Sequence, residues 1–339
     1  MALRIAVIGC GAHAQVAHIP ALKDNRHAEL VALCDSDVRK VNHLSALYNI
    51  PKRYTDFDDL KADDQIDAVV ISTPNYLHAP MTVASLEYGK HVLCEMPMGL
   101  NSEEALLMMK TAEREKKTLM PGLNTRLRPD VQTIRKFIEG GELGRLYYCK
   151  TGWLQGRSAW AMDGWRGERL RSGGGAFLSL GTTLLDFSLW LLSPKQPVSV
   201  TGVAHLRTPS AEVEDTAFAM VRFQDESLLT VEVGWSLLQE HDLTYFNAFG
   251  TTGAALLNPI RIHKEMHGHL VNVTPAVSTK GIQRASFKML IDLWIDALLK
   301  GAEPVVPARC GLVVNRIVDA FYESSAKHRE IALPGEQSD

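Results

Sequence analysis

The chain has 339 residues, of which 46% are hydrophobic and 22% charged, a composition typical of soluble globular proteins. At roughly 100–200 residues per domain, this length predicts two domains. The 36 Lys and Arg against 39 Asp and Glu give a net charge of −3. This balance lacks the basic excess of nucleic-acid-binding proteins, so neither DNA nor RNA is expected as a partner.

Five cysteines lie at scattered positions, which is neither a disulfide framework nor the spacing of a metal-ligand set. We therefore expect no bound metal and a reducing compartment. Gly9 and Gly11 interrupt the apolar N-terminal run before it could serve as a signal peptide, and no run approaches the roughly 18–20 apolar residues of a membrane span. These features predict a cytoplasmic protein with no membrane partner.

The first third of the chain alternates between strand-like and helix-like segments. Short apolar runs rich in β-branched residues predict buried strands, and each is followed by a segment with helical signals. Strands are expected at 3–9, 30–35, 68–73 and 91–96, and helices at 12–22, up to Tyr48, at 80–88 and at 105–115 after an Asn101/Glu104 capping box. This alternation predicts a parallel, doubly wound α/β sheet, assigned to a first domain at 1–122.

After about Leu123 the pattern changes to longer strands, of which the last two are joined by a polar turn at 224–226. Strands are expected at 145–154, 197–206, 215–223 and 227–237, and helices at 129–139, 176–192, 286–301 and 310–328. The pattern predicts an α+β second domain at 123–339, with a large open, mostly antiparallel sheet and helices on one face.

The segment GCGAHA, from Gly9 to Ala14, is a G-x-G-x-x-A motif between the first strand and the first helix. Gly9 would allow the tight turn, Gly11 the approach of the backbone to a pyrophosphate, and Ala14 the close packing of helix on strand. The helix N-terminus offers free N–H groups to phosphate. Asp35 ends the second strand, where it would bind the adenosine ribose and repel a 2′-phosphate. NAD is therefore predicted as cofactor, with NADP disfavoured.

The segment STPNYLHAP, from Ser72 to Pro80, follows the third predicted strand, where ligands of such sheets bind. Thr73, Pro74 and Asn75 would border the nicotinamide half of the cofactor. For His78, a role in holding local structure is favoured and a catalytic role is the alternative.

Several segments together resemble the Gfo/Idh/MocA oxidoreductases, named for glucose–fructose oxidoreductase and inositol dehydrogenase. They are GCGAHA with HIPAL, STPNYLHAP, YGKHVLCEMPM, PGLNTRLRPDV with IEGGELGRLYY, SGGGAFLSLGTTLLDFSLWLL and DAFYESSAKHREIALP. The resemblance implies a Rossmann domain followed by an open-sheet domain that often forms the interface of dimers or tetramers. It also implies hydride transfer between nicotinamide and a hydroxyl-bearing carbon of a sugar or cyclitol.

The sequence departs from that family where the family's catalytic groups stand. Met96 replaces the lysine of the Glu-Lys-Pro motif, and Ser179 and Thr183 replace an Asp and a His, while Asp186 remains at a more structural position. None of the three replacements can act as a general acid or base near pH 7. The loss of such a group costs roughly 10²–10⁴ in rate, so the catalytic residues are unknown, with His78 and Lys150 as weak candidates. By resemblance, the Met96–Pro97 bond is expected to be cis.

The resemblance and the motifs together give two sets of site residues. The predicted cofactor-binding residues are Gly9, Gly11, Ala12, His13, Ala14, Asp35, Ser72, Thr73, Pro74, Asn75, His78, Glu95, Met96 and Asn124. The predicted substrate pocket contains Met96, Asn124, Arg126, Trp153, Arg166, Ser179 and Thr183. Further polar residues that could have replaced the lost groups are Arg157, Asp163, Arg169, His241 and Tyr245, with Trp160 and Trp165 among them; a surface or packing role is favoured for each.

Three functions remain open from the sequence. The first is an NAD-dependent oxidoreductase for a small polar substrate, with a relocated or substrate-supplied acid–base group. The second is an NAD-binding protein without redox turnover, acting as a sensor or partner subunit. The third is a lyase or hydrolase that uses bound NAD transiently. A homodimer or homotetramer formed through the second sheet is expected.

Overall fold

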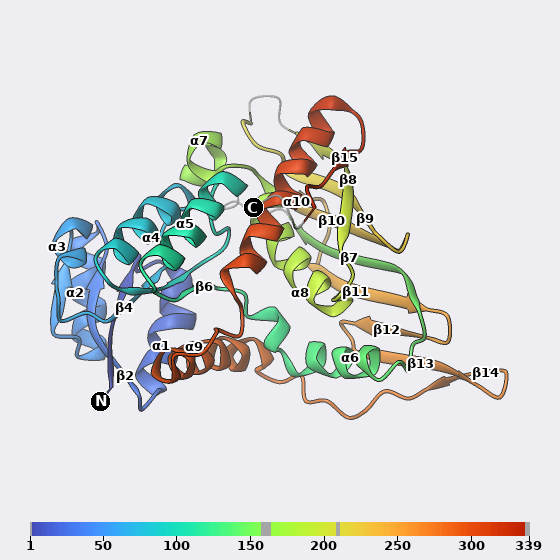
Figure 1. Cartoon of the computed structure of the whole chain (residues 1–339), viewed down its shortest axis with the longest axis horizontal. Helices are drawn as coiled ribbons and strands as arrows, with labels where there is room; N and C mark the ends of the chain where they lie inside the picture. The colour runs from blue at the N-terminus through green and yellow to red at the C-terminus, as the bar shows by residue number, and fades with distance from the viewer. Residues whose placement is uncertain (1, 157–163, 208–210, 336–339) are drawn as a thin grey trace. The chain divides into compact units, whose positions relative to one another are not determined.

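The computed structural model describes residues 2–156, 164–207 and 211–335. Within these residues the chain forms two compact units (Figure 1). The first unit runs to Asn124 and includes Gln283–Asn315, and the second contains Thr125–Ile282 and the residues from Arg316 onward. The first break lies next to the predicted boundary at 122, but 283–315, which we assigned to the second domain, group with the first unit.

Side-chain hydrogen bonds explain why this late segment groups with the first unit. Asn25 donates to Asp292 at 2.7 Å, and the amide of Asn315 donates to the carbonyl of Gly99 at 2.8 Å. Both bonds join residues that are more than 200 positions apart in sequence, so local sequence patterns give no sign of them.

The first unit contains a six-stranded sheet in the order β3-β2-β1-β4-β5-β6, with every neighbouring pair parallel. Helices α4 and α5 lie on one side of this sheet, and α1 and α9 lie on the other (Figure 1). The strands are β1 Leu3–Ile8, β2 Ala28–Cys34, β3 Lys52–Tyr54, β4 Ala68–Ile71, β5 His91–Cys94 and β6 Leu119–Pro121. The helices are α1 Ile19–Asp24, α2 Val38–Tyr48, α3 Phe57–Lys61, α4 His78–Glu87, α5 Ser102–Arg114 and α9 Ile282–Lys300, with a 3₁₀ turn at Asn75–Leu77.

The predicted parallel, doubly wound sheet is confirmed, and the Met96–Pro97 bond is cis as expected. Strands β3 and β6 were not predicted, because runs of three residues are too short to show a period. One of the two contacts of the predicted capping box is present: the side chain of Asn101 accepts from the Glu104 N–H at 2.9 Å. The Glu104 carboxylate, however, accepts from the N–H of Leu100 and not from that of Asn101.

The helix expected at 12–22 contains an irregular turn. Residues Ala14–His18 form a π-helical turn, in which the N–H of Ile19 bonds to the carbonyl of Ala14 five residues earlier, before α1 begins. In an α-helix, residues five apart point about 140° away from each other. In a π turn they lie nearly above one another. This turn therefore places His13 and His18 on the same side.

The second unit contains a nine-stranded sheet in the order β14-β13-β12-β11-β7-β10-β9-β8-β15. All pairs are antiparallel except β7 with β10, so the sheet is mostly antiparallel as predicted. The strands are β7 Leu146–Gly156, β8 Pro197–His205, β9 Thr216–Phe223, β10 Leu228–Leu237, β11 Leu243–Gly250, β12 Gly253–Leu257, β13 Arg261–Met266, β14 His269–Asn272 and β15 Ile331–Ala332. The helices are α6 Pro129–Glu139, α7 Arg169–Ser172, α8 Thr182–Leu192 and the part of α10 (Ala308–Lys327) from Arg316 onward, with 3₁₀ turns at Thr125–Leu127 and Gly164–Gly167 and a π turn at Phe177–Gly181.

The hairpin predicted at 224–226 joins β9 to β10, with Arg222 opposite Leu228. The four strands between Leu243 and Asn272 were not predicted. One further expectation was wrong: the segment Arg169–Leu192, which contains α7, the glycine bend at 173–175, the π turn and α8, is long and apolar enough to resemble a membrane span. Because 78% of its most apolar window is buried inside the structure, we interpret it as a core helix.

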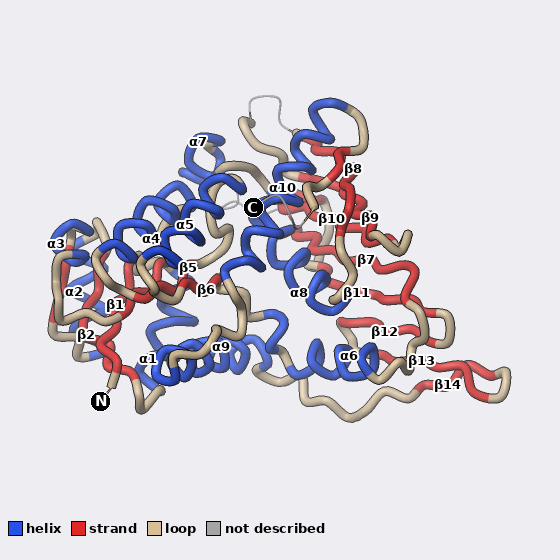
Figure 2. The backbone as a smooth tube through the Cα atoms, in the orientation of Figure 1, coloured by secondary structure: helices blue, strands red, loops and turns tan. Residues whose placement is uncertain are grey.

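The two faces of the second sheet differ. Helices α6 and α8 lie on one face, and in the described part of the chain no helix covers the other (Figure 2). Phe187 of α8 packs against Phe246 of β11, which lies opposite Thr151 of β7, so these residues mark the covered face. Side chains alternate along a strand, so Lys150 belongs to the open face.

Candidate functional site

The two glycines of the GCGAHA motif, in the turn after β1, have different surroundings. Gly9 has φ +88°, and a Cβ there would lie 2.4 Å from the carbonyl oxygen of Ser72, so only glycine fits. A Cβ on Gly11 would meet nothing within 4 Å in the described structure. Internal packing therefore does not require glycine at position 11. This open space in front of a helix N-terminus fits a dinucleotide pyrophosphate.

Asp35 follows β2 beside this turn. Its carboxylate accepts from the N–H of Cys10 at 2.7 Å and from the N–H of Asp37 at 2.9 Å, which fixes its orientation. Lys40, which we did not predict as a site residue, lies with Nζ 3.6 Å from the same carboxylate. Each carboxylate oxygen can accept more than one hydrogen bond, so Asp35 retains capacity for ribose hydroxyls.

The segment after β4 carries a second feature that fits a cofactor. The hydroxyl of Thr73 is buried and has no hydrogen-bond partner in the described structure. A buried polar atom without a partner is costly, and a ligand group could satisfy it. The predicted cofactor residues Gly9, Asp35, Ser72, Glu95 and Asn124 all follow the carboxyl ends of parallel strands, so they lie along one edge of the sheet.

His78 is 1% exposed and joins two of these loops. Its Nδ1 lies 2.7 Å from the carbonyl oxygen of Pro97 and its Nε2 lies 2.9 Å from that of Thr73. Two carbonyl acceptors favour the doubly protonated ring. Burial lowers the pKa of His78, but Cys94 and the two carbonyls outweigh it and raise the pKa to about 9. The structural interpretation of His78 is thus favoured over the catalytic one.

We expect the pairing of His78 to make stability depend on pH. Because the pKa in the folded protein, about 9, lies above the unfolded value, the stabilisation is complete below about pH 6.5 and is lost as the pH rises through 9. The difference between the folded and unfolded pKa values of His78 corresponds to about 3 kcal/mol in the free energy of unfolding. Denaturant unfolding at pH 6 and pH 9.5 measures it. Between these two pH values the free energy of unfolding should fall less in His78→Gln than in the wild-type protein. The control His43→Gln, which changes an exposed histidine, should show the wild-type fall. An equal fall in all three proteins would contradict this role of His78.

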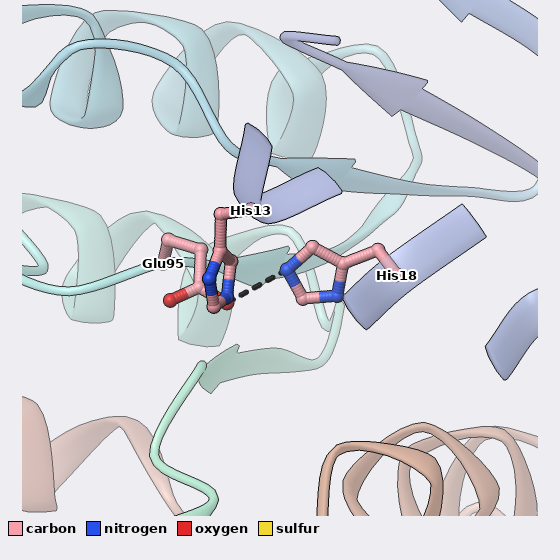
Figure 3. A group of neighbouring side chains, drawn as sticks. All are labelled: His13, His18 and Glu95. Carbon is pink, nitrogen blue, oxygen red and sulfur yellow. Dashed lines mark hydrogen bonds and ion pairs between the residues drawn. The ribbon is translucent and has the colours of Figure 1, made fainter. Parts of the chain in front are cut away.

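Glu95, which follows β5, receives two imidazoles on one oxygen (Figure 3). His18 Nε2 lies 2.7 Å and His13 Nε2 lies 3.1 Å from Glu95 Oε1. Burial raises the pKa of Glu95, but the charge and hydrogen bonds of the two histidines outweigh it and hold the pKa well below its usual range. The carboxylate is therefore ionised at neutral pH.

Sequence reasoning missed the side chains that hold this cluster. A Cβ on Gly122, after β6, would lie 2.7 Å from the Glu95 carboxyl, so glycine lets this loop pack on the carboxylate. Phe287 of α9 packs edge-on against the His13 ring, with 5.1 Å between ring centroids. The π turn that brings His18 beside His13 leaves no mark in a helical pattern. A glycine just after a strand was the one available signal.

The three ligand atoms of His13, His18 and Glu95 lie within 4.8 Å of one another, a spacing that could hold a metal ion. However, His18 Nδ1 is buried without a hydrogen-bond partner in the described structure. Metal-bound histidines almost always donate their second ring N–H to an acceptor. We therefore interpret the cluster as a hydrogen-bonded carboxylate–imidazole group.

In the second unit, Ser179 and Thr183 are the accessible residues of an otherwise buried helical stretch. Between Gly174 and Ser188, all other residues are buried. The two positions are four apart, so they form one polar stripe on the helix. Neither hydroxyl can serve as a base near pH 7.

A buried carboxylate that we did not predict holds the start of this helical stretch. Glu214, 3% exposed, accepts from the N–H groups of Gly175 and Phe177 at 3.0 and 2.9 Å, and from the hydroxyl of Tyr322 at 2.9 Å. A Cβ on Gly175 would lie 1.9 Å from the Glu214 carbonyl oxygen. The glycine run 173–175 therefore lets the chain pass close to Glu214.

Comparison with known proteins identifies the family. Residues 3–123 match the model of the oxidoreductase family with an NAD-binding Rossmann fold, and residues 131–256 match the Gfo/Idh/MocA C-terminal domain. The chain belongs to the Gfo/Idh/MocA oxidoreductase family. The predicted family and its NAD-binding fold are thereby confirmed.

Individual relatives are distant. A putative UDP-kanosamine synthase oxidoreductase subunit of Amycolatopsis mediterranei is 30% identical over 75% of both chains. Inositol 2-dehydrogenase of Rhizobium meliloti is 27% identical over 98% of this chain and 100% of its own. A levoglucosan dehydrogenase solved with NADH and levoglucosan has the same fold, with a TM-score of 0.88 and 22% identity over 99% of this chain and 100% of that one.

Within this Gfo/Idh/MocA oxidoreductase, the residues predicted for the substrate pocket fall in both units. Met96 is half-buried after β5, and Asn124 donates to Ser286 at 2.8 Å; both belong to the first unit. Arg126 forms a buried, two-pronged ion pair with Asp186, with one of its bonds at 3.1 Å. That guanidinium is committed to a neighbouring helix, which favours a structural role.

The remaining candidates lie in the second unit. Lys150 lies on the open face of the sheet with its amine 5.7 Å from the centre of the Tyr245 ring, away from the face that carries α8. Trp153 is half-buried on β7, and the Arg166 guanidinium stacks 4.7 Å from the Trp165 ring centre. Arg169 lies over the ring of Tyr322, and His241 is exposed. Arg157, Trp160 and Asp163 lie outside the described residues.

Proposed function

We propose that this protein uses NAD to interconvert a hydroxyl and a carbonyl group on a small polar substrate of the sugar or cyclitol class. The observation that carries the proposal is the first turn, where Gly9 is required by packing but Gly11 faces open space at a helix N-terminus. The unpartnered Thr73 hydroxyl at the same sheet edge supports it. Inositol and levoglucosan dehydrogenases among the related proteins favour the substrate class.

When bound, NAD⁺ accepts a hydrogen with its electron pair from the hydroxyl-bearing carbon. The N–H groups at the start of the first helix would bind the pyrophosphate, and Asp35 would accept from the adenosine ribose. Thr73, Pro74 and Asn75 would border the nicotinamide half. Ser179 and Thr183 supply hydroxyls that bind and orient a polar substrate and that leave its protonation state unchanged.

The test is a titration with NAD⁺ and NADH by calorimetry, followed by absorbance at 340 nm with polyols, aldoses, glycosides and nucleotide sugars. We expect binding, and a change in absorbance with at least one polyhydroxy substrate. Binding without turnover of any substrate would contradict the proposal and favour a sensor or partner subunit. Bond cleavage in a glycoside with NAD retained and no net redox change would favour the lyase or hydrolase alternative.

The preference for NAD over NADP rests on Asp35, whose carboxylate would repel a 2′-phosphate. We expect Asp35→Ser to weaken NAD⁺ binding and to improve NADP⁺ binding by about tenfold, because the repulsion is removed and Lys40 is freed from its carboxylate partner. Paired calorimetric titrations measure both affinities. Asp37→Ser, which changes the neighbouring half-buried carboxylate that caps α2, is the control. An unchanged NADP⁺ affinity in Asp35→Ser would contradict the assignment.

We also propose that the open face of the second sheet forms the contact of a homodimer or homotetramer. Val203, Phe218 and Met220 lie on this face and are 60%, 50% and 38% exposed. Exposed apolar side chains gathered on one face are typical of protein–protein contacts. We expect Phe218→Asp to lower the mass measured by light scattering to that of a smaller species, with Leu270→Asp at the sheet edge as control. A wild-type monomer would contradict this contact.

A further inference from the structure

A dehydrogenase of alcohols needs a group that accepts the hydroxyl proton, and the positions where related enzymes carry such groups hold Met96, Ser179 and Thr183. This inference therefore rests on the proposed function. Among the described site residues of the first unit, the carboxylate–imidazole cluster of His13, His18 and Glu95 contains a partly exposed imidazole. An imidazole can accept a hydroxyl proton near neutral pH. His78 is buried with both nitrogens engaged.

The cluster has a buried part and an accessible part. The His18 side chain is 1% exposed and that of Glu95 is 14% exposed, whereas that of His13 is 41% exposed. His18 donates to Glu95 Oε1 at 2.7 Å, which fixes this oxygen where His13 Nε2 reaches it at 3.1 Å. Phe287 packs edge-on against the ring. The His13 ring is thus held in one orientation, with one edge on the carboxylate.

This contact determines the protonation pattern of the ring. Because an ionised carboxylate only accepts, His13 Nε2 must carry a hydrogen. In neutral His13, Nδ1 therefore has the free lone pair. The hydrogen bond recorded for this ring is the one from Nε2 to Glu95, so Nδ1 is the nitrogen that this carboxylate does not engage. A base held in one tautomer by a carboxylate, on a side chain that is itself 41% exposed, is the arrangement used in carboxylate–histidine catalysis.

The position in the sheet agrees with this role. His13 follows β1 and Glu95 follows β5, on the two sides of β4 at the carboxyl edge. Between β1 and β4 the strand order reverses, and ligands of such sheets bind at that point. Glu95 is followed directly by Met96, the position at which the lysine is missing.

We propose that His13 is the proton-transfer residue of this protein, with Glu95 and His18 as its positioning residues. In oxidation, the substrate O–H bond breaks and its proton bonds to His13 Nδ1. The electron pair left on oxygen forms the second bond of the carbonyl, while the carbon-bound hydrogen leaves with its electron pair to NAD⁺. In reduction the same proton returns from Nδ1 to the alkoxide oxygen.

The electrostatics support this assignment. The charge of Glu95 raises the pKa of His13, burial opposes this, and the hydrogen bond to Glu95 adds to it. The groups that face the ring are Glu95 from the loop after β5, His18 from the π turn and Phe287 from α9. A histidine whose pKa is raised from its ordinary value by a neighbouring carboxylate can exchange protons with a substrate hydroxyl near neutral pH.

The first experiment needs no substrate: ¹⁵N NMR of the imidazoles in the full-length protein, with His13 assigned by its loss in His13→Asn. We expect the Nε2–H tautomer in neutral His13, and a lower pKa of this residue in Glu95→Gln. An Nδ1–H tautomer in the wild-type protein would overturn the proposal even if Glu95→Gln failed to fold. The proposal would also be overturned if Glu95→Gln folded and the pKa of His13 were the same as in the wild-type protein.

The second experiment is kinetic, with the substrate found in the 340 nm screen. We expect His13→Ala to lower kcat by about 10²–10⁴ at saturating NAD⁺, and the acidic limb of the pH profile to disappear. Added imidazole should restore part of kcat, because it can occupy the accessible space left by the ring. Exposed His43→Ala is the matched control and should retain both rate and pH profile.

The outcomes separate the two proposals. A wild-type protein that binds NAD⁺ but turns over no substrate contradicts the proposed function, and the NMR tautomer then decides about His13. Turnover in which His13→Ala keeps its kcat and acidic limb contradicts the role of His13 alone. If a chelator abolished the activity of the wild-type protein and a divalent ion restored it, the role of His13 in proton transfer would also be overturned. The three side chains would then hold a metal ion.

Discussion

Gly11→Val is expected to lower the affinity for NAD⁺ on the order of 100-fold or more, a loss of about 2.7 kcal/mol, with no loss of stability in the free protein. A Cβ at this position meets nothing within 4 Å, and Gly11 is not among the residues with positive φ, so neither packing at the Cβ nor the backbone conformation requires glycine here. The added side chain fills the space in front of the helix N-terminus. Calorimetric titration and denaturant unfolding measure the two quantities.

Gly9→Ala is the matched variant in the same turn, with the opposite expected behaviour. At Gly9 the Cβ would lie 2.4 Å from the Ser72 carbonyl oxygen and φ is +88°, so the free protein should lose stability whether or not a cofactor is present. Retained NAD⁺ affinity in Gly11→Val would show that the dinucleotide binds elsewhere. Equal loss of stability in both variants would show that Gly11 is a packing glycine.

Glu214→Ala is expected to lower the free energy of unfolding by about 3 kcal/mol or more. The carboxylate is the acceptor for two backbone N–H groups at the start of the core helix and for the Tyr322 hydroxyl. Its removal leaves the Phe177 N–H and the Tyr322 hydroxyl without this acceptor, at about 1–3 kcal/mol each before relaxation, and leaves the Gly175 N–H with only its 3.2 Å bond to the Tyr322 oxygen. Denaturant unfolding measures the change.

Glu214→Gln keeps the shape of the side chain and one acceptor oxygen, so we expect a smaller loss than with alanine. Exposed Glu240→Ala is the control and should change the free energy of unfolding by less than about 0.5 kcal/mol. If Glu214→Ala were as stable as the control, water or another group would have to satisfy these donors, and Glu214 would not hold the helix start.

The first sheet was predictable because each of its long strands is a continuous apolar run that ends at a glycine or a polar residue. The GCGAHA motif could be placed because it stands directly between such a strand and a helix. The edge strands β3 and β6 escaped prediction because three residues carry too little pattern. The strands from Leu243 to Asn272 are interrupted by polar residues and short turns, so no apolar alternation singles them out.

The candidate site was predictable in its backbone and less so in its side chains. Asp35 and the loop after β4 were found from position alone. The neighbours of His13 were not, because the π turn at Ala14–His18 breaks the helical period by which sequence reasoning assigns faces. Glu95, 82 positions away from His13, and Glu214, 39 positions from Gly175, act through contacts between distant segments. Such contacts depend on tertiary structure, which single-sequence patterns do not encode.

The accessible stripe of Ser179 and Thr183 has an evolutionary consequence. Every residue around these two positions from Gly174 to Ser188 is buried, so the helix is anchored by side chains other than those two. Accessible positions tolerate replacement at little thermodynamic cost, usually within about 0.5 kcal/mol. Substitutions at these two positions can therefore add or remove acidic and basic side chains with little loss of stability. This helix allows related proteins to differ in their acid–base groups while they keep the same fold.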